Sequence, residues 1–360
     1  MDLPLFFSLR SHPVSETTVE ITEFYDVHSR DVSSTELSHP RLSGHDPKWV
    51  QSISQGLNYK LFLLQCGPSD SPSGRLPLAL VSGPIFGKFL VSLPYVNTGG
   101  VYARTPEIAS ELVDTACDLA DQLKVRYLEL RHEVPVDHPR FNHQRTDKFH
   151  MRLSLPETDA ELDKSFKSKL RSQIKKCGTY NHKTTWGGME MLPDFYRVFA
   201  TNMRDLGTPV FSKKLFESIV RTFEGNAEFC VLHNEGTPVA AALLVHSEGS
   251  TEVPSASSLR NWNRMGPNMW MYRALLERAI ERKSHTFDFG RSTMASSTYK
   301  FKKQWGATAY PAVWQYYVRE GNVEQMRPES QTNQKLIRVW QKLPICLTNV
   351  IGPPIVRGIP

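Results

Sequence analysis

The chain has 360 residues, of which 40% are hydrophobic and 22% are charged, and its formal net charge is +6 at pH 7. This length and composition predict two domains of ordinary size with well-formed cores. The positive charge is too small for a dedicated nucleic-acid-binding protein, but it favours an anionic ligand wherever the cations cluster. The five cysteines are scattered and no pair has CxxC spacing. We therefore expect reduced, mostly buried thiols in a cytosolic protein without a structural metal site.

The N-terminal segment does not have the pattern of a signal peptide. Its sequence, MDLPLFFSLRSHP, has only a short apolar run and no basic segment before that run. No stretch approaches the apolar length needed to cross a bilayer. We expect residues 1–16 to be loosely ordered and the protein to be cytoplasmic.

The first half of the chain predicts strands and one long helix in the order of a mixed α/β layer. Apolar runs predict strands at 59–64, 76–82 and 125–130, and residues 106–123 have helical periodicity. Four histidines in or beside the next loop lack metal-ligand spacing, and we expect them to be solvated. They are His132, His138, His143 and His150.

In the second half, residues 159–176 predict one amphipathic helix. A basic row on it contains Lys164, Lys167, Arg171 and Lys175. The first turn is acidic and the rest is basic, which suits the helix dipole and also concentrates cations. The row is therefore either a solvated face or a contact for phosphate groups.

Further along, residues 228–233, 239–246 and 251–259 predict strands, and 239–245 is apolar enough for a central strand buried on both faces. Residues 267–282 predict a helix. Residues 332–343 predict one more amphipathic helix before a Pro/Gly-rich tail.

Residues 287–306, FDFGRSTMASSTYKFKKQWG, form the most informative stretch. A short apolar strand is halted by Gly290, where the backbone can take a positive φ. Ser296 or Ser297 then suits the N-cap of a short helix. On that helix one face carries Phe301 and Trp305, which suit a core. Another face carries Tyr299, Lys302 and Lys303.

The segment from Tyr299 to Gly306, YKFKKQWG, resembles the Y-x-F-K-x-x-F-G segment of FemAB-like transferases, with Trp305 in place of the usual Phe. Residues 288–292 and the basic helix resemble the same family. The similarity covers roughly residues 50–320 and is greatest to the branch associated with exosortase (PEP-CTERM) and exopolysaccharide loci, which also fits the closing Gly-Pro-Pro tail.

This resemblance implies a mixed α/β fold of the GNAT acyltransferase type, with two tandem GNAT-like units. On it we base four predicted segments. They are a loose N-terminus at 1–16, a first unit at 17–145, an acyltransferase unit at 146–320, and a C-terminal helix and tail at 321–360.

The resemblance also suggests roles for individual residues. Lys302 would stabilise the oxyanion of acyl transfer or grip donor phosphates. Asp288 would take the amine proton or orient the acceptor, although pairing with Arg291 is an equally simple role. Tyr299 would hydrogen-bond the donor or the leaving group. The expected substrate-binding residues are Lys167, Arg171, Lys175, Arg291, Lys303 and Trp305.

Residues 263–268, NRMGPN, open the helix predicted at 267–282. In acetyltransferases of this fold, R/Q-x-x-G-x-G/A at this position presents backbone N–H groups to the pyrophosphate of coenzyme A. Gly266 fits the first glycine of that pattern, and Arg264 supplies a basic residue two positions before it. Asn268 replaces the second small residue, and Pro267 removes one donor. The segment is therefore either a coenzyme A site or a proline-started helix after a glycine turn.

No nucleophile constellation is present, so direct attack by an amine suits the sequence better than a covalent intermediate. We expect an N-acyltransferase that uses acyl-CoA and modifies an amine of a cell-envelope or exopolysaccharide precursor, near a membrane surface and without DNA. One alternative is a Fem-type ligase that uses aminoacyl-tRNA. Another is a non-catalytic protein that binds an anionic glycan or a nucleotide sugar.

Overall fold

The computed structural model describes residues 18–24, 43–68, 71–84, 86–321, 323 and 331–359. Residues 1–16, predicted to be loose, lie outside this part. The chain divides into two compact units. The first holds the residues up to 145, 313–322 and 358–360, and the second holds Thr146–Ala312 and Val323–Arg357. The sequence-based boundary at 320 differs from this division, because 313–318 pair with 127–132 of the first unit.

The first unit is built on strands that are mostly antiparallel. In sheet order they are β1 (Val19–Phe24), β2 (Lys60–Cys66), β3 (Gly74–Gly83), β4 (Gly87–Val91), β6 (Tyr127–His132) and the end of β13 (Thr308–Val318), while β5 (Tyr102–Ala103) pairs with β3. The pairing of β4 with β6 is parallel.

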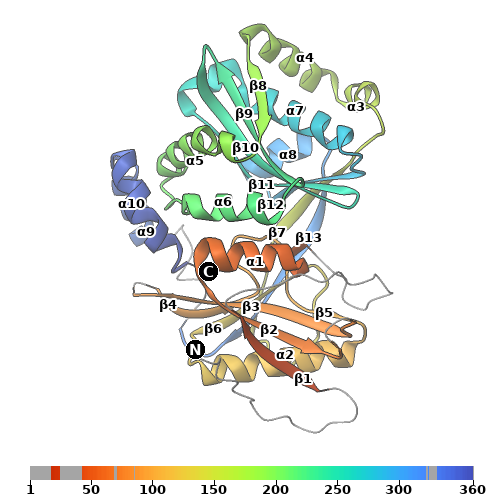
Figure 1. The fold of residues 1–360 in the computed structure, drawn as a ribbon, viewed down its shortest axis with the longest axis vertical. Helices are drawn as coiled ribbons and strands as arrows, with labels where there is room; N and C mark the ends of the chain where they lie inside the picture. The colour runs from red at the N-terminus through yellow and green to blue at the C-terminus, as the bar shows by residue number, and fades with distance from the viewer. Residues whose placement is uncertain are drawn as a thin grey trace. The chain divides into compact units, whose positions relative to one another are not determined.

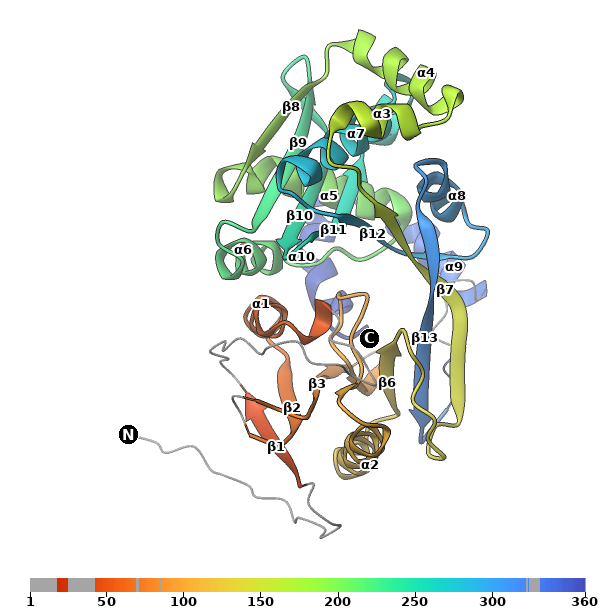
Figure 2. The ribbon, with the colours of Figure 1, turned by 90° about the vertical axis from the view of Figure 1, so that its right-hand side faces the viewer.

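Two helices complete the first unit, α1 (Pro47–Leu57) and α2 (Pro106–Gln122). Helix α2 begins where the sequence predicts, because Thr105 caps it and Pro106 suits its first turn. Its apolar stripe packs on β2 and β3 around Leu112 and Ala116, and α2 lies along that sheet in Figures 1 and 2.

The prediction that the four histidines are solvated is wrong for three of them. His132, His138 and His150 are buried and His143 is half-buried. His132 belongs to strand β6, and His143 and His150 belong to β7 (His143–Ser154). Within the described residues, no group of three His, Cys, Asp or Glu side chains has the arrangement of a metal site. All five cysteines are free thiols, and all but Cys346 are buried, as predicted.

The second unit has a mixed sheet with helices on both faces. In sheet order its strands are β7, β12 (Thr286–Thr293), β11 (Ser250–Ser258), β10 (Thr237–Ser247), β9 (Ala227–Asn234) and β8 (Lys183–Gly187). Strand β10 is buried at every position from 238 to 246, which confirms the predicted central strand.

Alternating residues of these strands pack on different helices. Cys230 of β9 and Ala242 of β10 share a core with α7 (Pro267–Glu281), whereas Phe229 lies 4.5 Å from Phe195 of α5 (Leu192–Leu206), between ring centroids. Side chains alternate across a strand, so α7 covers one face and α5 covers the other, with α6 (Lys213–Thr222) beside α5.

The prediction of a single helix at 159–176 is wrong. The structure has α3 (Asp159–Ser165) and α4 (Ser168–Cys177), and Phe166 and Lys167 between them are extended. Phe166 is buried with its ring centroid 5.4 Å from that of Trp305. The Arg171 guanidinium donates to the Phe166 carbonyl at 2.9 Å. This side-chain donor takes the place of the backbone N–H that would bond the carbonyl in a continuous helix.

The C-terminal segment forms two helices instead of one. Helix α9 (Gln331–Trp340) overlaps the predicted range of 332–343, but α10 (Ile345–Val356) occupies the segment expected to be a Pro/Gly-rich tail and contains Pro353 and Pro354. None of the helices among the described residues combines the length and hydropathy needed to span a membrane.

Candidate functional site

Strands β11 and β12 separate after a short parallel contact. They pair only at 250–252 with 286–288. Beyond this point β12 follows β7, with a register shift between Asp288 and Arg291, and β11 follows β10. The backbone edges of 253–258 and 289–293 are therefore not paired with each other.

Asp288 holds the β12 backbone at the point of separation. Its Oδ1 accepts the Gly290 N–H at 2.7 Å, and its Oδ2 accepts the Arg152 Nε–H at 3.0 Å. Gly290 has φ +74°, a conformation that glycine adopts at little cost. The ion pair predicted between Asp288 and Arg291 is not the one found, because Asp288 pairs with Arg152 on the adjacent strand β7. Both carboxylate oxygens are engaged in positioning this turn.

Lys302 is buried beside the same turn. It lies on α8 (Ser297–Gln304), whose N-cap is Ser296, one of the two residues predicted for that position. Its Nζ donates to the carbonyl oxygens of Gly290 at 3.1 Å and Arg291 at 3.0 Å. An ammonium has three N–H donors, so one more can be offered to a ligand.

Burial lowers the pKa of Lys302 to about 8, while the nearby Asp288 carboxylate opposes the shift. Desolvation disfavours the charged form of a lysine. Lys302 therefore carries a partly desolvated charge at the strand separation, which is unusual for a lysine on a basic helix.

The other residues predicted on α8 divide between core and surface. Trp305 is only 1% exposed and packs on Phe166 and Tyr272, so its assignment to substrate binding is corrected. Tyr299 is half-buried, with its ring edge-on to Phe149 at 6.2 Å, and Lys303 is exposed. Lys302 and Tyr299 thus remain beside the separated strands as candidates.

The start of α7 is a compact turn. Gly266 has φ +64° and its N–H donates to the Asn263 carbonyl, while the N–H groups of Met269 and Trp270 both donate to the Gly266 carbonyl. Pro267 has no N–H, so few donors of this helix end are available to a pyrophosphate. Arg264 is exposed and Asn268 is half-buried.

The turn also packs closely against α4. A Cβ added at Gly266 would meet the Cys177 Sγ, and one added at Gly178 would lie 2.9 Å from the Trp270 ring. Gly266 therefore has both a conformational and a packing reason to be glycine.

We expect Gly266→Ala to lower the free energy of unfolding by about 1–3 kcal/mol, from backbone strain and overpacking together. Adding Cys177→Ala should recover part of this loss, because it removes the sulfur atom that the new methyl group meets. Urea denaturation of the two single variants and the double variant measures this coupling. Strictly additive effects would contradict the packing explanation.

The basic row runs from Lys164 at the end of α3, through Lys167 in the break, to Arg171 and Lys175 on α4. Lys167, Arg171 and Lys175 are all exposed. Between residues 164 and 183 the chain has seven Lys or Arg and no Asp or Glu. All seven side chains are exposed, so this segment presents a continuous run of positive charge to solvent.

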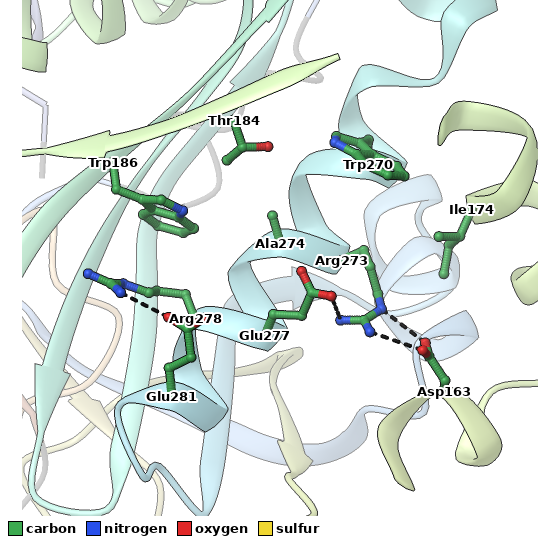
Figure 3. Close-up of a pocket in the computed structure, with 10 residues that line it drawn as sticks. All are labelled: Asp163, Ile174, Thr184, Trp186, Trp270, Arg273, Ala274, Glu277, Arg278 and Glu281. Carbon is green, nitrogen blue, oxygen red and sulfur yellow. Dashed lines mark hydrogen bonds and ion pairs between the residues drawn. The ribbon is translucent and has the colours of Figure 1, made fainter. Parts of the chain in front are cut away.

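A pocket of about 360 Å³ lies on α7, where β8, α3 and α4 meet it, and Figure 3 shows its lining. The indoles of Trp186 and Trp270 form apolar walls. The lining carboxylates and guanidiniums belong to Asp163, Arg273, Glu277, Arg278 and Glu281.

The positive charges in this pocket are already paired. Arg273 donates to both carboxylate oxygens of Asp163 at 3.0 and 3.1 Å and pairs with Glu277 at 2.8 Å. Arg278 pairs with Glu281 and lies over the Trp186 ring. Burial raises the pKa of Glu277. The Arg273 guanidinium opposes this shift, and neighbouring carboxylates add to it. The pocket suits an organic cation better than a phosphate group.

Sequence reasoning missed this pocket and gave none of its lining residues. Positions 270, 274, 277 and 281 lie three or four residues apart on α7, and this periodic mixture of tryptophan and carboxylate is the signal that could have indicated the pocket.

Residues 164–303 match the family of the acetyltransferase (GNAT) domain. No curated protein matches the chain in sequence. Solved structures share its fold at low identity. The crystal structure of FemX has a TM-score of 0.58 and 16% identity over 85% of this chain and 96% of that one.

Two further structures cover most of the chain. L-PGS from Bacillus licheniformis has a TM-score of 0.51 and 12% identity, over 82% of this chain and 91% of that one. A tandem GNAT protein from the clavulanic acid biosynthesis pathway has a TM-score of 0.50 and 13% identity, over 79% of this chain and 91% of that one.

These similarities confirm the mixed α/β fold of the GNAT type. The family match of residues 164–303 also supports the enzyme class, an acyltransferase. These matches do not distinguish the predicted exosortase-associated branch from other proteins of this fold.

Proposed function

We propose that the chain transfers an acyl group from acyl-CoA to an amine at the separation of β11 and β12. The observation that carries this proposal is the end of pairing after Glu252 and Asp288, beside the buried Lys302 ammonium. The pantetheine arm of coenzyme A contains amide groups that can hydrogen-bond to a strand edge. An unpaired edge is a template for such an extended chain.

In the proposed reaction the neutral acceptor amine attacks the thioester carbonyl. A C–N bond forms, the C–S bond breaks, and the proton lost by the amine ends on the thiolate, which gives an amide and free coenzyme A. The remaining N–H of Lys302 would stabilise the oxyanion, because a fixed cation in a dry site favours developing negative charge. Tyr299 would donate to the leaving thiolate.

Asp288 has a positioning role in this proposal. Its bonds to the Gly290 N–H and to Arg152 fix the β12 turn whose carbonyls hold Lys302. Arg291 and Lys303 lie on the same two elements and would contact the donor or acceptor. Arg264, Gly266 and Asn268 would border the donor phosphates, with fewer backbone donors than an open glycine turn provides.

A second candidate is transfer from aminoacyl-tRNA. The exposed run of seven Lys and Arg residues favours it, because such a surface suits a polyanion and exceeds what coenzyme A requires. Lys167, Arg171 and Lys175 would then contact the tRNA backbone. The resemblance to FemAB-like proteins of exopolysaccharide loci suggests an amine of an envelope or exopolysaccharide precursor as the acceptor of either donor.

Native mass spectrometry of the full chain, titrated with acetyl-CoA and separately with bulk aminoacylated tRNA, tests the donor. We expect saturable binding of acetyl-CoA that changes little with salt. Binding of charged tRNA alone, with an affinity that falls steeply as salt rises, would replace the first candidate by the second. Binding of neither donor would contradict both and favour the non-catalytic binding protein.

The basic row supplies a matched control for this titration. The variant K167Q/R171Q/K175Q should weaken tRNA binding and leave acetyl-CoA binding within twofold. The variant K88Q/K213Q/K214Q removes the same charge from exposed positions elsewhere and should weaken tRNA binding less.

A further inference from the structure

Helices α9 and α10 expose an unusual amount of aliphatic surface. Among the described residues, eight large hydrophobic side chains are exposed, and four of them lie on these two helices. They are Leu336, Val339, Leu347 and Val350, with exposed fractions of 64, 62, 42 and 71%. Such a concentration on one short segment marks an interaction surface.

The opposite sides of both helices are anchored to the second unit. Thr348 and Val356 are buried, and a Cβ at Gly352 would lie 2.9 Å from the Val210 backbone. On α9, Ile337 packs against Gly207, where an added Cβ would lie 3.2 Å from the Ile337 Cβ. Just after α9, Gln341 donates to the Asp205 carbonyl, and Arg204 donates to the Leu343 carbonyl. Figure 1 shows α10 and α9 at the edge of this unit, near α5.

The helical positions separate an inward face from an outward face. Thr348, Gly352 and Val356 are four residues apart and share the buried face of α10. Val350 lies two residues from both Thr348 and Gly352, which is about 200° around a helix, and therefore on the opposite side. The anchored face holds the helices in place while Leu347 and Val350 remain exposed.

The charge of this segment has one sign only. Residues 331–359 contain four Lys or Arg and no Asp or Glu. The cations are Lys335, Arg338, Lys342 and Arg357, and all of them are exposed. The cations at 335 and 338 on α9, and at 342 just after it, lie near Leu336 and Val339 in the chain, an arrangement typical of helices that lie in a membrane interface.

We propose that the exposed face of α9 and α10 docks on an anionic lipid bilayer surface. The aliphatic side chains enter the headgroup boundary, and the flanking Lys and Arg attract acidic headgroups. A second copy of the chain fits this face less well, because two such faces would bring cations together without a carboxylate to pair with. The docking does not depend on the proposed function, but it would bring the enzyme to an acceptor anchored in a membrane.

The test is flotation of the full chain with vesicles of phosphatidylcholine, with or without 30% phosphatidylglycerol. We expect flotation with the anionic vesicles that is at least tenfold stronger than with neutral ones and that weakens with salt. The variant L336S/V339S/L347S/V350S should lose binding, and K335Q/R338Q/K342Q should lose the preference for anionic lipid. The control V134S/M294S, which alters exposed hydrophobic residues elsewhere, should bind normally.

Thermal unfolding of each variant checks that the fold is retained, since all the altered side chains are exposed. Equal flotation of the wild type and the four-serine variant would overturn the proposal, as would an absence of flotation. Concentration-dependent dimerisation that this variant abolishes, without lipid binding, would assign the face to a second copy instead. Acetyl-CoA binding is measured separately, so failure here leaves the proposed function standing.

Discussion

Lys302→Met should lower kcat for acyl transfer by about 10²–10³-fold, the loss typical of removing one preorganised donor from an oxyanion site. Methionine has a similar length and keeps the apolar stem packed, but it supplies no N–H. The carbonyls of Gly290 and Arg291 would lose the donor that now holds them. We therefore also expect a loss of about 1–3 kcal/mol in the free energy of unfolding.

The pH dependence separates catalysis from structure. Because the pKa of Lys302 is lowered to about 8 in the folded chain from an ordinary 10.5, the ammonium is lost as pH rises through 8. The kcat assigned to this cation should fall above that pH. Between pH 8 and 10.5 the unfolded chain binds the proton that the folded chain has lost, so the free energy of unfolding should rise with pH in this window.

Lys300→Met is the matched control, because Lys300 is an exposed lysine on the same helix and has no assigned contact with the donor or acceptor. It should leave kcat within about threefold, which is less than 1 kcal/mol of transition-state stabilisation. If Lys302→Met folded normally and kept near-normal kcat, Lys302 would be a purely structural residue.

Glu228→Gln should be the most destabilising substitution in the second unit, by about 3–5 kcal/mol. Glu228 is buried on β9. Arg278 donates to both of its carboxylate oxygens at 2.8 Å, and Arg282 and His246 contact its Oε1 at 3.1 and 3.0 Å. Glutamine would leave two guanidiniums around a group that has no negative charge.

Glu228 should also determine part of the decrease in the free energy of unfolding at acid pH. Burial by itself would raise its pKa, but the hydrogen bonds from His246 and Arg278 prevail and lower it to about 2 from 4.5. The stabilisation is present above pH 4.5 and is lost as pH falls through 2, and it amounts to about 3 kcal/mol. Urea denaturation from pH 7 to pH 2 measures it, and Glu228→Gln should flatten this dependence.

Glu281→Gln gives the comparison, since Glu281 is an exposed carboxylate that pairs with the same Arg278. An exposed pair contributes little, so this variant should cost less than about 1 kcal/mol. Equal effects of the two substitutions would mean that burial of the Glu228 cluster is not what stabilises it.

Local sequence signals predicted the elements whose stability is local. The apolar run of β10, the Pro106 start of α2 and the Ser296 cap of α8 all required only neighbouring residues. The break between α3 and α4 could not be predicted in this way. Phe166 and Trp305 are distant in sequence, and their ring contact favours the extended backbone that interrupts the helix.

The sequence predicted which residues lie at the site better than it predicted which residues they pair with. Lys302 and Asp288 lie at the strand separation, but the pairing of Asp288 with Arg152 joins residues 136 positions apart, and no local pattern indicates it. Trp305 fitted the resemblance and a core face equally, and burial decided for the core. Helix α10 was not predicted, because it contains Pro353 and Pro354 and proline is normally excluded from the interior of a helix.

The central claim is that the donor lies between the separated strands, and hydrogen exchange of the full chain with saturating acetyl-CoA tests it most directly. We predict slower exchange at backbone amides of residues 253–258 and 289–293, because the donor would lie along the facing edges of β11 and β12, which do not pair with each other beyond residues 252 and 288. Exchange in peptides from the pocket of Figure 3, including Trp186 and Glu277, should be unchanged. Saturating binding of acetyl-CoA that protects the pocket peptides and leaves both strand edges unprotected would contradict the claim.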